Sequence, residues 1–406
     1  MEKYRLGNGI ILLFQKNSSK SVALEVMVKA GSNYENKNIL GISHFLEHML
    51  FEGTKKRPDS MIIANEIEKY GAEFNAYTST NRTAFFIKII NKRFEKALDI
   101  LSDMVSDPLF REDMIAKEKK VILREIDMVT DDPRQHQWIL FQKKLFDKHP
   151  AKNPTYGTIE SVSSISRKQL LDYYKRHYVP NNMIISVAGN INDVKNKIQK
   201  YFGSLNPIKT PKRKAINEPL NKKIKALVEK RKTQNSYIVL GYKAPVRTHK
   251  DSYSMDVIAS ILGRGQSGWI FDEIRNKHGL SYQTGVQHEA EDDYGTFAVF
   301  AGLDKKNIPK AKSLILKQFK RLQKVTKKEL DEAKTYIEGH HALELEDNFH
   351  YADNMSFWEM IKDAGLSEDY IKNIRKVTIG DVKRAAKKYL NKNYTFIAIE
   401  QKYSKG

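Results

Sequence analysis

The pattern of apolar and polar positions divides the chain into short strands and amphipathic helices that recur in both halves. In the first half, residues 75–90 form two strand-like runs and are followed by a helical pattern over 92–105. The second half repeats this order, with strand-like runs over 282–301 and a helical pattern over 308–322. A recurrence of this kind predicts an internal repeat of one structural unit.

A second repeated pattern ends each half. Residues 165–188 and 377–399 both give a polar helix with a tyrosine near its end, followed by a short apolar strand. We therefore expect an α+β fold of two similar domains, each a mostly antiparallel sheet flanked by helices. We place the first domain at 1–205, a basic linker at 206–218 and the second domain at 219–406.

The helix predicted over residues 40–51 has an unusual polar face. At about 100° per residue, His44 and His48 lie about 40° apart, and Glu47 lies beside them. An ordinary amphipathic helix fills its polar face with Lys, Glu and Gln, but this segment contains no Lys. Two neutral imidazoles at i and i+4 suit zinc, which in catalytic sites usually has a third protein ligand.

A second helix, predicted over 113–131, supplies candidate carboxylates. Glu118 and Glu125 fall inside the apolar stripe of this helix, where residues that face the core are expected. Burying an ionised carboxylate is costly unless it is paired or binds metal. Each feature alone fits a structural or salt-bridged residue, whereas together they favour a metal site that includes His44 and His48. The stripe consists of Met114, Val121, Met128 and Val129.

The motif H-x-x-E-H is the inverted form of the zincin motif. The stretch HFLEHMLFEGT, which begins at His44, resembles the signature of the pitrilysin-type (M16) zinc peptidases, closest to their short-chain mitochondrial-processing-peptidase-like (M16B) members. The resemblance implies a zinc metalloendopeptidase in which His44, His48 and Glu125 bind Zn2+ and Glu47 is the general base. By the same match, Glu118 supports the site without binding the ion.

Two further segments match this family. Arg275 and Tyr282, in the stretch RNKHGLSY, resemble a pair that contacts substrate and stabilises the developing oxyanion in relatives. The segment GAEFNAYT resembles the edge strand on which the family adds its substrate as a further strand, a binding mode with little sequence dependence. It gives the candidate substrate-binding residues Phe74, Asn75, Ala76, Tyr77 and Thr78.

The resemblance also implies partners. Family members of this length typically enclose a chamber as dimers, so we expect a homodimer or a heterodimer with a related chain. The second domain of one subunit would then complete the first domain of the other. Substrates would be unfolded peptides or short polypeptides that can enter the chamber. Two alternatives stay open at this stage: a processing protease that trims a specific precursor, and a non-catalytic scaffold of the same fold.

Composition restricts the possible class of protein and its expected cellular compartment. The chain has 406 residues, a formal net charge of +21 and no cysteine, so disulfides are excluded and cytoplasmic residence is expected. A strand-like run begins at Gly9, so we expect no leader peptide, and no apolar run reaches membrane-spanning length. The densest basic tract, 209–232, lacks interleaved aromatic residues, so we expect neither nucleic acid nor a membrane as a partner.

Other motifs are interpreted as structural. Residues 263–268 contain G-x-G-x-x-G, but they follow a predicted helix rather than a strand, so a turn between helices is favoured over a dinucleotide site. His341 and Glu344 imitate the metal motif, with Leu345 in the place of the second His. Four other histidines lack partners at ligand spacing: His136, His149, His177 and His288.

Overall fold

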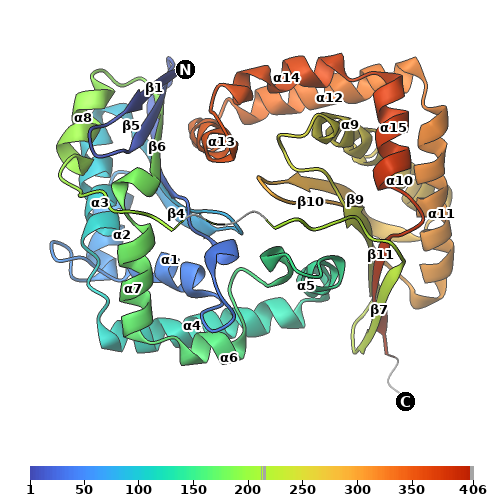
Figure 1. Cartoon of the computed structure of the whole chain (residues 1–406), viewed down its shortest axis with the longest axis horizontal. Coiled ribbons are helices and arrows are strands. Elements are labelled where there is room, and N and C mark those ends of the chain that lie inside the picture. The colour runs from blue at the N-terminus through green and yellow to red at the C-terminus, as the bar shows by residue number, and fades with distance from the viewer. Residues whose placement is uncertain (212, 214–215, 403–406) are drawn as a thin grey trace. The chain divides into compact units, whose positions relative to one another are not determined.

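The fold is described from a computed structural model of the chain (Figure 1), which covers all residues except 212, 214, 215 and 403–406, and the side chain of Tyr282. The chain forms two compact units, each built from three segments. The first unit comprises Met1–Asp127, Asn153–Lys214 and Leu343–Ser367. The second unit comprises Met128–Lys152, Ala215–Ala342 and Glu368–Gly406.

The first unit contains a six-stranded sheet in the order β1-β2-β6-β3-β5-β4. Only the neighbours β2 and β6 are parallel, and all the other pairs are antiparallel. Strand β4 lies at one edge, where it pairs with β5 on one side only. The strands are β1 (Glu2–Arg5), β2 (Ile11–Lys16), β3 (Ser21–Val28), β4 (Glu73–Thr78), β5 (Thr83–Ile90) and β6 (Met183–Gly189).

The second unit contains a five-stranded sheet in the order β7-β11-β8-β10-β9. Its parallel pair, β7 and β11, takes the place of β2 and β6, and its edge strand β9 takes the place of β4. The predicted internal repeat of an α+β domain with a mostly antiparallel sheet is therefore confirmed. The strands are β7 (Lys225–Arg231), β8 (Ser236–Lys243), β9 (Ser281–Ala290), β10 (Gly295–Leu303) and β11 (Thr395–Gln401).

The helices of the first unit that come from the first half of the chain pack on one face of its sheet through a large apolar core. Strand residues such as Leu24, Val26 and Phe85 meet helix residues such as Phe45 and Leu101 there, all of them fully or almost fully buried. The helices are α1 (Ile42–Phe51), α2 (Ser60–Glu68), α3 (Phe94–Ser106), α4 (Glu112–Asp131), α6 (Ile159–Ser164), α7 (Arg167–His177) and α8 (Val194–Phe202).

The second unit has its own apolar core between its sheet and its helices. Residues 263–268 connect two of these helices, as the sequence predicted, and do not follow a strand. The helical segments are α9 (Asp251–Gly263), α10 (Trp269–Phe271), the π-helical segment η5 (Asp272–Lys277), α11 (Ile308–Arg321), α12 (Lys327–Glu344), α14 (Leu366–Lys376) and α15 (Ile379–Tyr389).

The two units exchange one helix each. Helix α5 (Pro133–Leu145) comes from the first half of the chain but packs on β8 and β11 of the second unit. Helix α13 (Asn348–Ile361) comes from the second half but packs on β3 and β6 of the first unit. The predicted division at 206–218 falls between the two sheets, but a local sequence pattern does not show which sheet a helix will cover.

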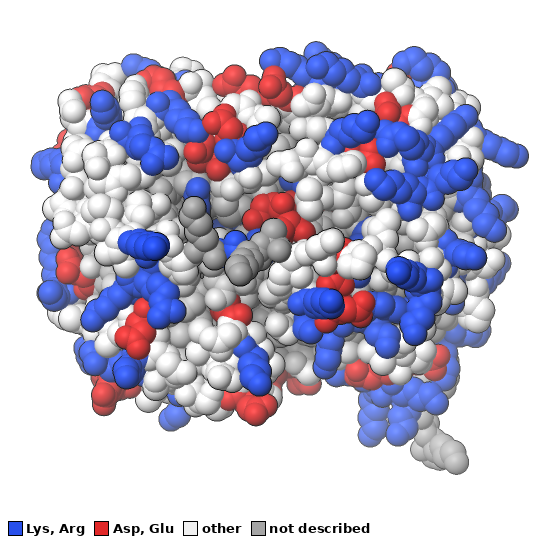
Figure 2. Space-filling view, viewed as in Figure 1, with Lys and Arg blue, Asp and Glu red and all other residues white. Residues whose placement is uncertain are grey.

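Surface charge is spread over helices rather than confined to one segment. Figure 2 shows Lys and Arg interspersed with Asp and Glu over the visible face. On α14, for example, Arg375 pairs with Glu338, and Lys372 lies 2.9 Å from Asp369. Among the described residues, no helix combines the length and the apolar character that crossing a membrane requires.

Candidate metal centre

Helix α1 presents two histidines and a glutamate away from the core. Its other face is fully buried, because Phe45, Leu46 and their apolar neighbours pack against the sheet. The residues on the remaining arc of the helix must then point to the opposite side. The helix predicted over 40–51 is confirmed, and it holds His44, Glu47 and His48 on this side.

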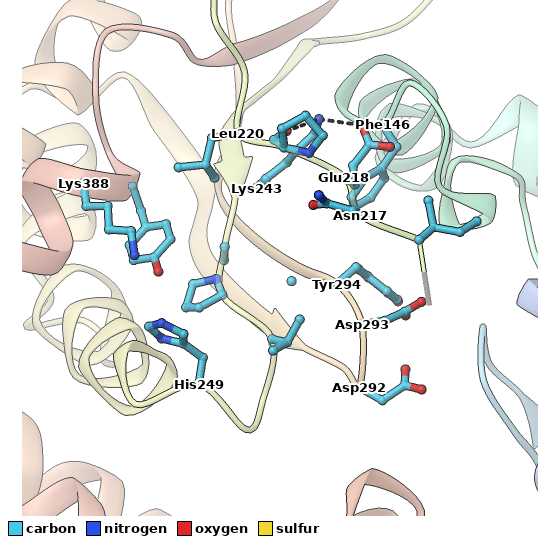
Figure 3. A pocket seen from close by; sticks show the side chains of 17 residues that line it. Phe146, Asn217, Glu218, Leu220, Lys243, His249, Asp292, Asp293, Tyr294 and Lys388 are labelled. Carbon is cyan, nitrogen blue, oxygen red and sulfur yellow. Dashed lines mark hydrogen bonds and ion pairs between the residues drawn. The ribbon is translucent and has the colours of Figure 1, made fainter. Parts of the chain in front are cut away.

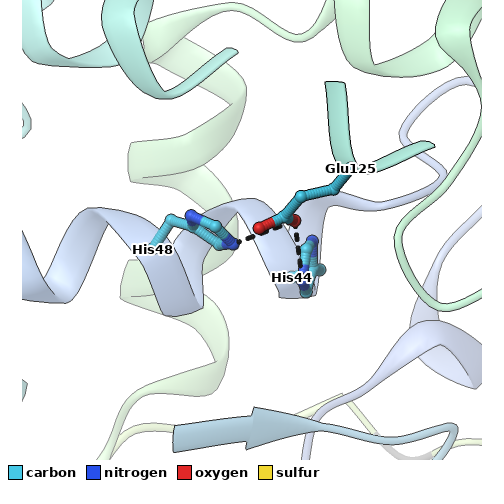
Figure 4. Close-up of side chains that lie close together, drawn as sticks. All are labelled: His44, His48 and Glu125. Atoms are coloured by element: carbon cyan, nitrogen blue, oxygen red, sulfur yellow. Dashed lines mark ion pairs between the residues drawn. The ribbon is translucent and has the colours of Figure 1, made fainter. Parts of the chain in front are cut away.

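Glu125 of α4 lies opposite the two histidines (Figure 4). Its Oε2 atom is 3.8 Å from Nε2 of His44 and 3.5 Å from Nε2 of His48. Two ligand atoms bound tetrahedrally to one zinc ion lie about 3.4 Å apart, so these separations fit a shared ion better than direct hydrogen bonds. In the described part of the chain, no other group of His, Cys, Asp or Glu meets the same criterion.

Glu118 orients one of these histidines. Its Oε2 atom lies 3.0 Å from Nδ1 of His48, which is the ring nitrogen that faces away from Glu125. A hydrogen bond at Nδ1 fixes the tautomer that leaves Nε2 as a metal donor. The side chain of Glu118 is only 8% exposed, so its carboxylate depends on His48 as a buried partner.

The face of α4 that packs on the core differs from the predicted stripe. Ile115, Ile122 and Ile126 form its buried line together with Glu118, whereas Met128 is 70% exposed. The prediction was centred on the wrong residues, because several apolar positions on this helix compete for one narrow face. The inference that Glu118 lies among core residues is confirmed, but the same inference for Glu125 is wrong, because its side chain is 40% exposed.

The surroundings of the two imidazoles shift their pKa values in opposite directions. Burial, reinforced by the nearby His48, lowers the pKa of His44 to about 3, so this ring is neutral and able to donate a lone pair. Burial also opposes a charge on His48, but the hydrogen bond to Glu118 and the charges of Glu125 and Glu47 raise its pKa overall. The negative charge around His48 is thus an environment that favours a bound cation.

Glu47 is close to the donors but is held by a different partner. Thr78 of β4 donates a hydrogen bond from its hydroxyl to the Glu47 carboxylate. Burial raises the pKa of Glu47, while the hydrogen bond from Thr78 and the charge of His48 oppose that shift. A carboxylate with a raised pKa is suited to accept and release a proton near neutral pH.

Glu35 caps helix α1 from outside it. Helix α1 begins after Gly41, which has no side chain with which to cap it. The Glu35 carboxylate accepts hydrogen bonds from the backbone N–H groups of Gly41, at 2.6 Å, and Ser43, at 2.9 Å. Sequence analysis missed this role, because a glutamate six residues before a helix matches no local capping pattern.

The protonation of Glu35 makes a testable contribution to stability. Burial raises its pKa to about 7 against hydrogen bonds from Ser43 and Gly41 that lower it. Between about pH 4.5 and 7 the folded protein therefore retains a proton that the unfolded chain releases, so the free energy of unfolding falls as the pH rises. Relative to Glu35→Gln, the zinc-free wild type should lose up to about 3 kcal/mol across this window. Urea unfolding of both proteins at pH 5 and pH 7.5 measures the difference, and parallel pH profiles would contradict it.

Strand β4 has the position expected for a substrate strand. It is an edge strand with one unpaired side. Phe74, Ala76 and Thr78 face the core and α1, whereas Asn75 and Tyr77 point to the other face of the sheet. The backbone of β4 is therefore the part of these five residues that is able to form main-chain hydrogen bonds with another strand, and its Ala76 N–H already donates to Oδ1 of Asn75 at 2.8 Å.

The two candidate residues from the second half lie in the second unit. Arg275 belongs to η5, and its guanidinium lies 4.9 Å from the ring centroid of Phe271. Tyr282 lies in β9, but its side chain is outside the described part of the structure. Their roles stay predictions.

The second unit also contains a cavity of about 590 Å³ (Figure 3). Beside it Lys243 and Glu218 form a buried ion pair of 2.6 Å, and Glu218 also accepts three backbone hydrogen bonds, from residues 147–149. Glu218 lies at the end of the predicted linker, so these contacts of Glu218 connect the start of the second sheet to the loop after α5. None of the metal donors lines the cavity.

Comparisons with known proteins identify the family of this chain. Residues 10–159 match the family model "Insulinase (Peptidase family M16)", and residues 164–337 match "Peptidase M16 inactive domain". An uncharacterized zinc protease of Bacillus subtilis, YmxG, is 31% identical over 85% of each chain. An uncharacterized zinc protease of Rickettsia felis is 32% identical over 82% of this chain and 81% of its own.

A solved structure shows the same fold. A protease from Helicobacter pylori superposes with a TM-score of 0.92 over 98% of this chain and 99% of its own, at 24% sequence identity. The matched models together span both structural repeats, and the first one contains the H-x-x-E-H motif and Glu125. The chain therefore belongs to peptidase family M16.

Proposed function

We propose that this chain is a zinc-dependent endopeptidase that hydrolyses unfolded peptides or short polypeptides. The observation that carries the proposal is the convergence of His44, His48 and Glu125 from two separate helices, with Glu47 beside them on α1. The proteins named zinc proteases among its relatives support the choice of metal. A scaffold without activity would need neither the metal donors nor a buried carboxylate placed next to them.

Each residue then has a distinct role. His44, His48 and Glu125 would hold Zn2+, which when bound acts as a Lewis acid on a water molecule and on the scissile carbonyl. Glu47 takes the proton from the attacking water and passes it to the leaving amine. Glu118 keeps His48 in the tautomer that leaves Nε2 free as a donor.

Substrate binding is assigned to β4 and to the second domain. The unpaired side of β4, residues 73–78, would pair with an extended peptide backbone, so affinity would depend little on side chains. Arg275 and Tyr282 would contact substrate and stabilise the oxyanion. We further propose a dimer of the M16B type in the cytoplasm, in which the second domain of the partner completes the site and only unfolded chains enter.

The proposal is tested by measuring zinc and cleavage on one preparation. We expect about one zinc per chain, cleavage of an internally quenched peptide of about twenty residues, and no cleavage of a stable folded protein of similar size. A chelator should remove both the metal and the activity, and added Zn2+ should restore both. A chain that binds zinc stoichiometrically yet cleaves no member of a diverse peptide library would refute the proposed activity.

A further inference from the structure

Helix α13 covers the face of the first sheet that the catalytic helix leaves free. It belongs to the first unit although the segments before and after it belong to the second. Ala352 and Met355 of α13 are fully buried against small or apolar strand residues, including Ala23, Ala84 and Ala188. The small strand residues let the helix approach the sheet closely, so the two faces of this sheet carry α1 and α13 respectively.

The contact between α13 and the sheet includes buried polar groups. The exchanged helix α5 packs on the second sheet through an apolar cluster that includes Leu140 and Phe141. Under α13, the Ser356 hydroxyl is 2.7 Å from that of Ser186 on β6, and both residues are fully buried. Lys88 of β5 also reaches Asp347 at the start of α13, at 2.6 Å. Polar contacts depend on geometry, so they fix the position of this helix more specifically than apolar contacts alone.

One group of these contacts reaches the candidate substrate strand. The Tyr77 hydroxyl on β4 donates a hydrogen bond to Asp353 of α13. Arg82, from the turn between β4 and β5, donates from Nε to the same hydroxyl at 3.2 Å. The Arg82 guanidinium also lies 5.0 Å from the ring centroid of Phe357 on α13. The end of β4 and its turn are therefore bound to α13 at several points.

The next residue of β4 is bound to the catalytic helix. Thr78 donates its hydroxyl hydrogen bond to Glu47, while Tyr77 points to the opposite face and contacts Asp353. Two successive residues thus attach one edge strand to the helix of the general base and to α13. A shift of β4 at Tyr77 would also move the backbone that follows it, including Thr78.

We propose that Tyr77 and Asp353 are positioning residues that hold β4 in the register and twist needed to accept a peptide strand. This inference rests on the proposed function of β4. The side chain of Tyr77 would not touch substrate, since it points into the contact with α13. Its effect would pass through the strand backbone to the bound peptide and, through Thr78, to the orientation of Glu47.

Two variants and one matched control test this role. Tyr77→Phe removes only the hydroxyl, and Asp353→Ala removes the carboxylate that accepts its hydrogen bond. Ser356→Ala removes a buried hydrogen bond of the same helix to the same sheet, but at β6 and not at β4. KM and kcat are measured for a peptide long enough to pair along β4 and for a short one, with zinc content and thermal midpoint recorded for each protein.

For the long peptide, Tyr77→Phe and Asp353→Ala should raise KM about three- to tenfold, the loss expected for one hydrogen bond that positions the strand. KM for the short peptide, the zinc content of all variants, and both KM values of Ser356→Ala should stay at wild-type levels. The double variant should be no worse than either single one, because both remove the same bond.

A KM for the long peptide that stays at the wild-type value in both variants would overturn the inference. An equal rise in Ser356→Ala would also overturn it, since that result would mean that loosening α13 anywhere is enough. If a variant is too unstable for kinetics, the dissociation constant of the long peptide is measured on the Glu47→Gln background at low temperature. The failure of the proposed function is distinguishable, because then the wild type itself would cleave neither peptide.

Discussion

Replacing Glu47 by Gln is expected to lower kcat for peptide cleavage by about 10²- to 10⁴-fold while the protein keeps its zinc. The amide has nearly the same shape as the carboxylate and still accepts a hydrogen bond from Thr78, but it cannot take up a proton. His44, His48 and Glu125 are unchanged, so the metal site should be preserved. The checks are steady-state cleavage of a quenched peptide and metal analysis on the same sample.

The matched control for Glu47→Gln is Glu68→Gln at the end of α2. Glu68 is exposed and is not among the metal donors, so its neutralisation should leave both zinc content and kcat at wild-type values. Wild-type turnover in Glu47→Gln would remove Glu47 as the proton carrier. Loss of zinc together with activity would instead show that Glu47 holds the metal, contrary to its hydrogen bond with Thr78.

Sequence reasoning could predict the residues at the centre of this site, because they share one short motif or depart from the apolar pattern around them. His44 and His48 share a helix, so their spacing alone brings them together. Glu118 and Glu125 stood out because carboxylates interrupted a predicted apolar stripe. Glu118 is buried, at 6% exposure, whereas Glu125 is 40% exposed and the predicted stripe residues are not the buried ones. The repeat of strands and helices was equally readable, since each element carries its own periodicity.

Sequence reasoning could not predict the residues that hold the site in place, because their contacts join segments that are far apart in the chain. Glu35 acts on a helix that begins at Ile42, and nothing in its neighbours marks it as a cap. Asp353 meets Tyr77 across 276 positions of the chain. The exchange of α5 and α13 is likewise set by tertiary packing, because each helix has an apolar side that either sheet could bury.

Comparing the two repeated domains shows which features belong to the shared fold and which belong only to the candidate site. The second sheet reproduces the strand order of the first without its additional strand β1. After the strand β8 that corresponds to β3, the chain enters α9, whose Met255, Ile258 and Leu262 are fully buried and which carries no pair of histidines. The same architecture therefore exists with and without metal donors, and the chemistry follows from a few side chains placed on it.

The second large effect is expected at the metal ligands, in a graded order. His48→Ala removes a donor nitrogen, so the protein should no longer retain zinc after dialysis. Glu118→Gln leaves all three donors but weakens the bond that orients His48, and loss of such a partner typically lowers metal affinity about 10- to 100-fold. Zinc competition with a chromogenic chelator measures both affinities, and Glu112→Gln, an exposed carboxylate at the start of α4, is the control.

The two variants should then respond differently to added metal. Excess Zn2+ should restore most of the activity of Glu118→Gln, because its donor set is intact, but it should not restore His48→Ala. If Glu118→Gln instead lost zinc as completely as His48→Ala, Glu118 would have to be a ligand itself. That result would conflict with the geometry, in which Glu118 contacts Nδ1 of His48, while Glu125 faces the Nε2 atoms of both histidines. The grading therefore tests which carboxylate of α4 binds the ion and which one only orients a ligand.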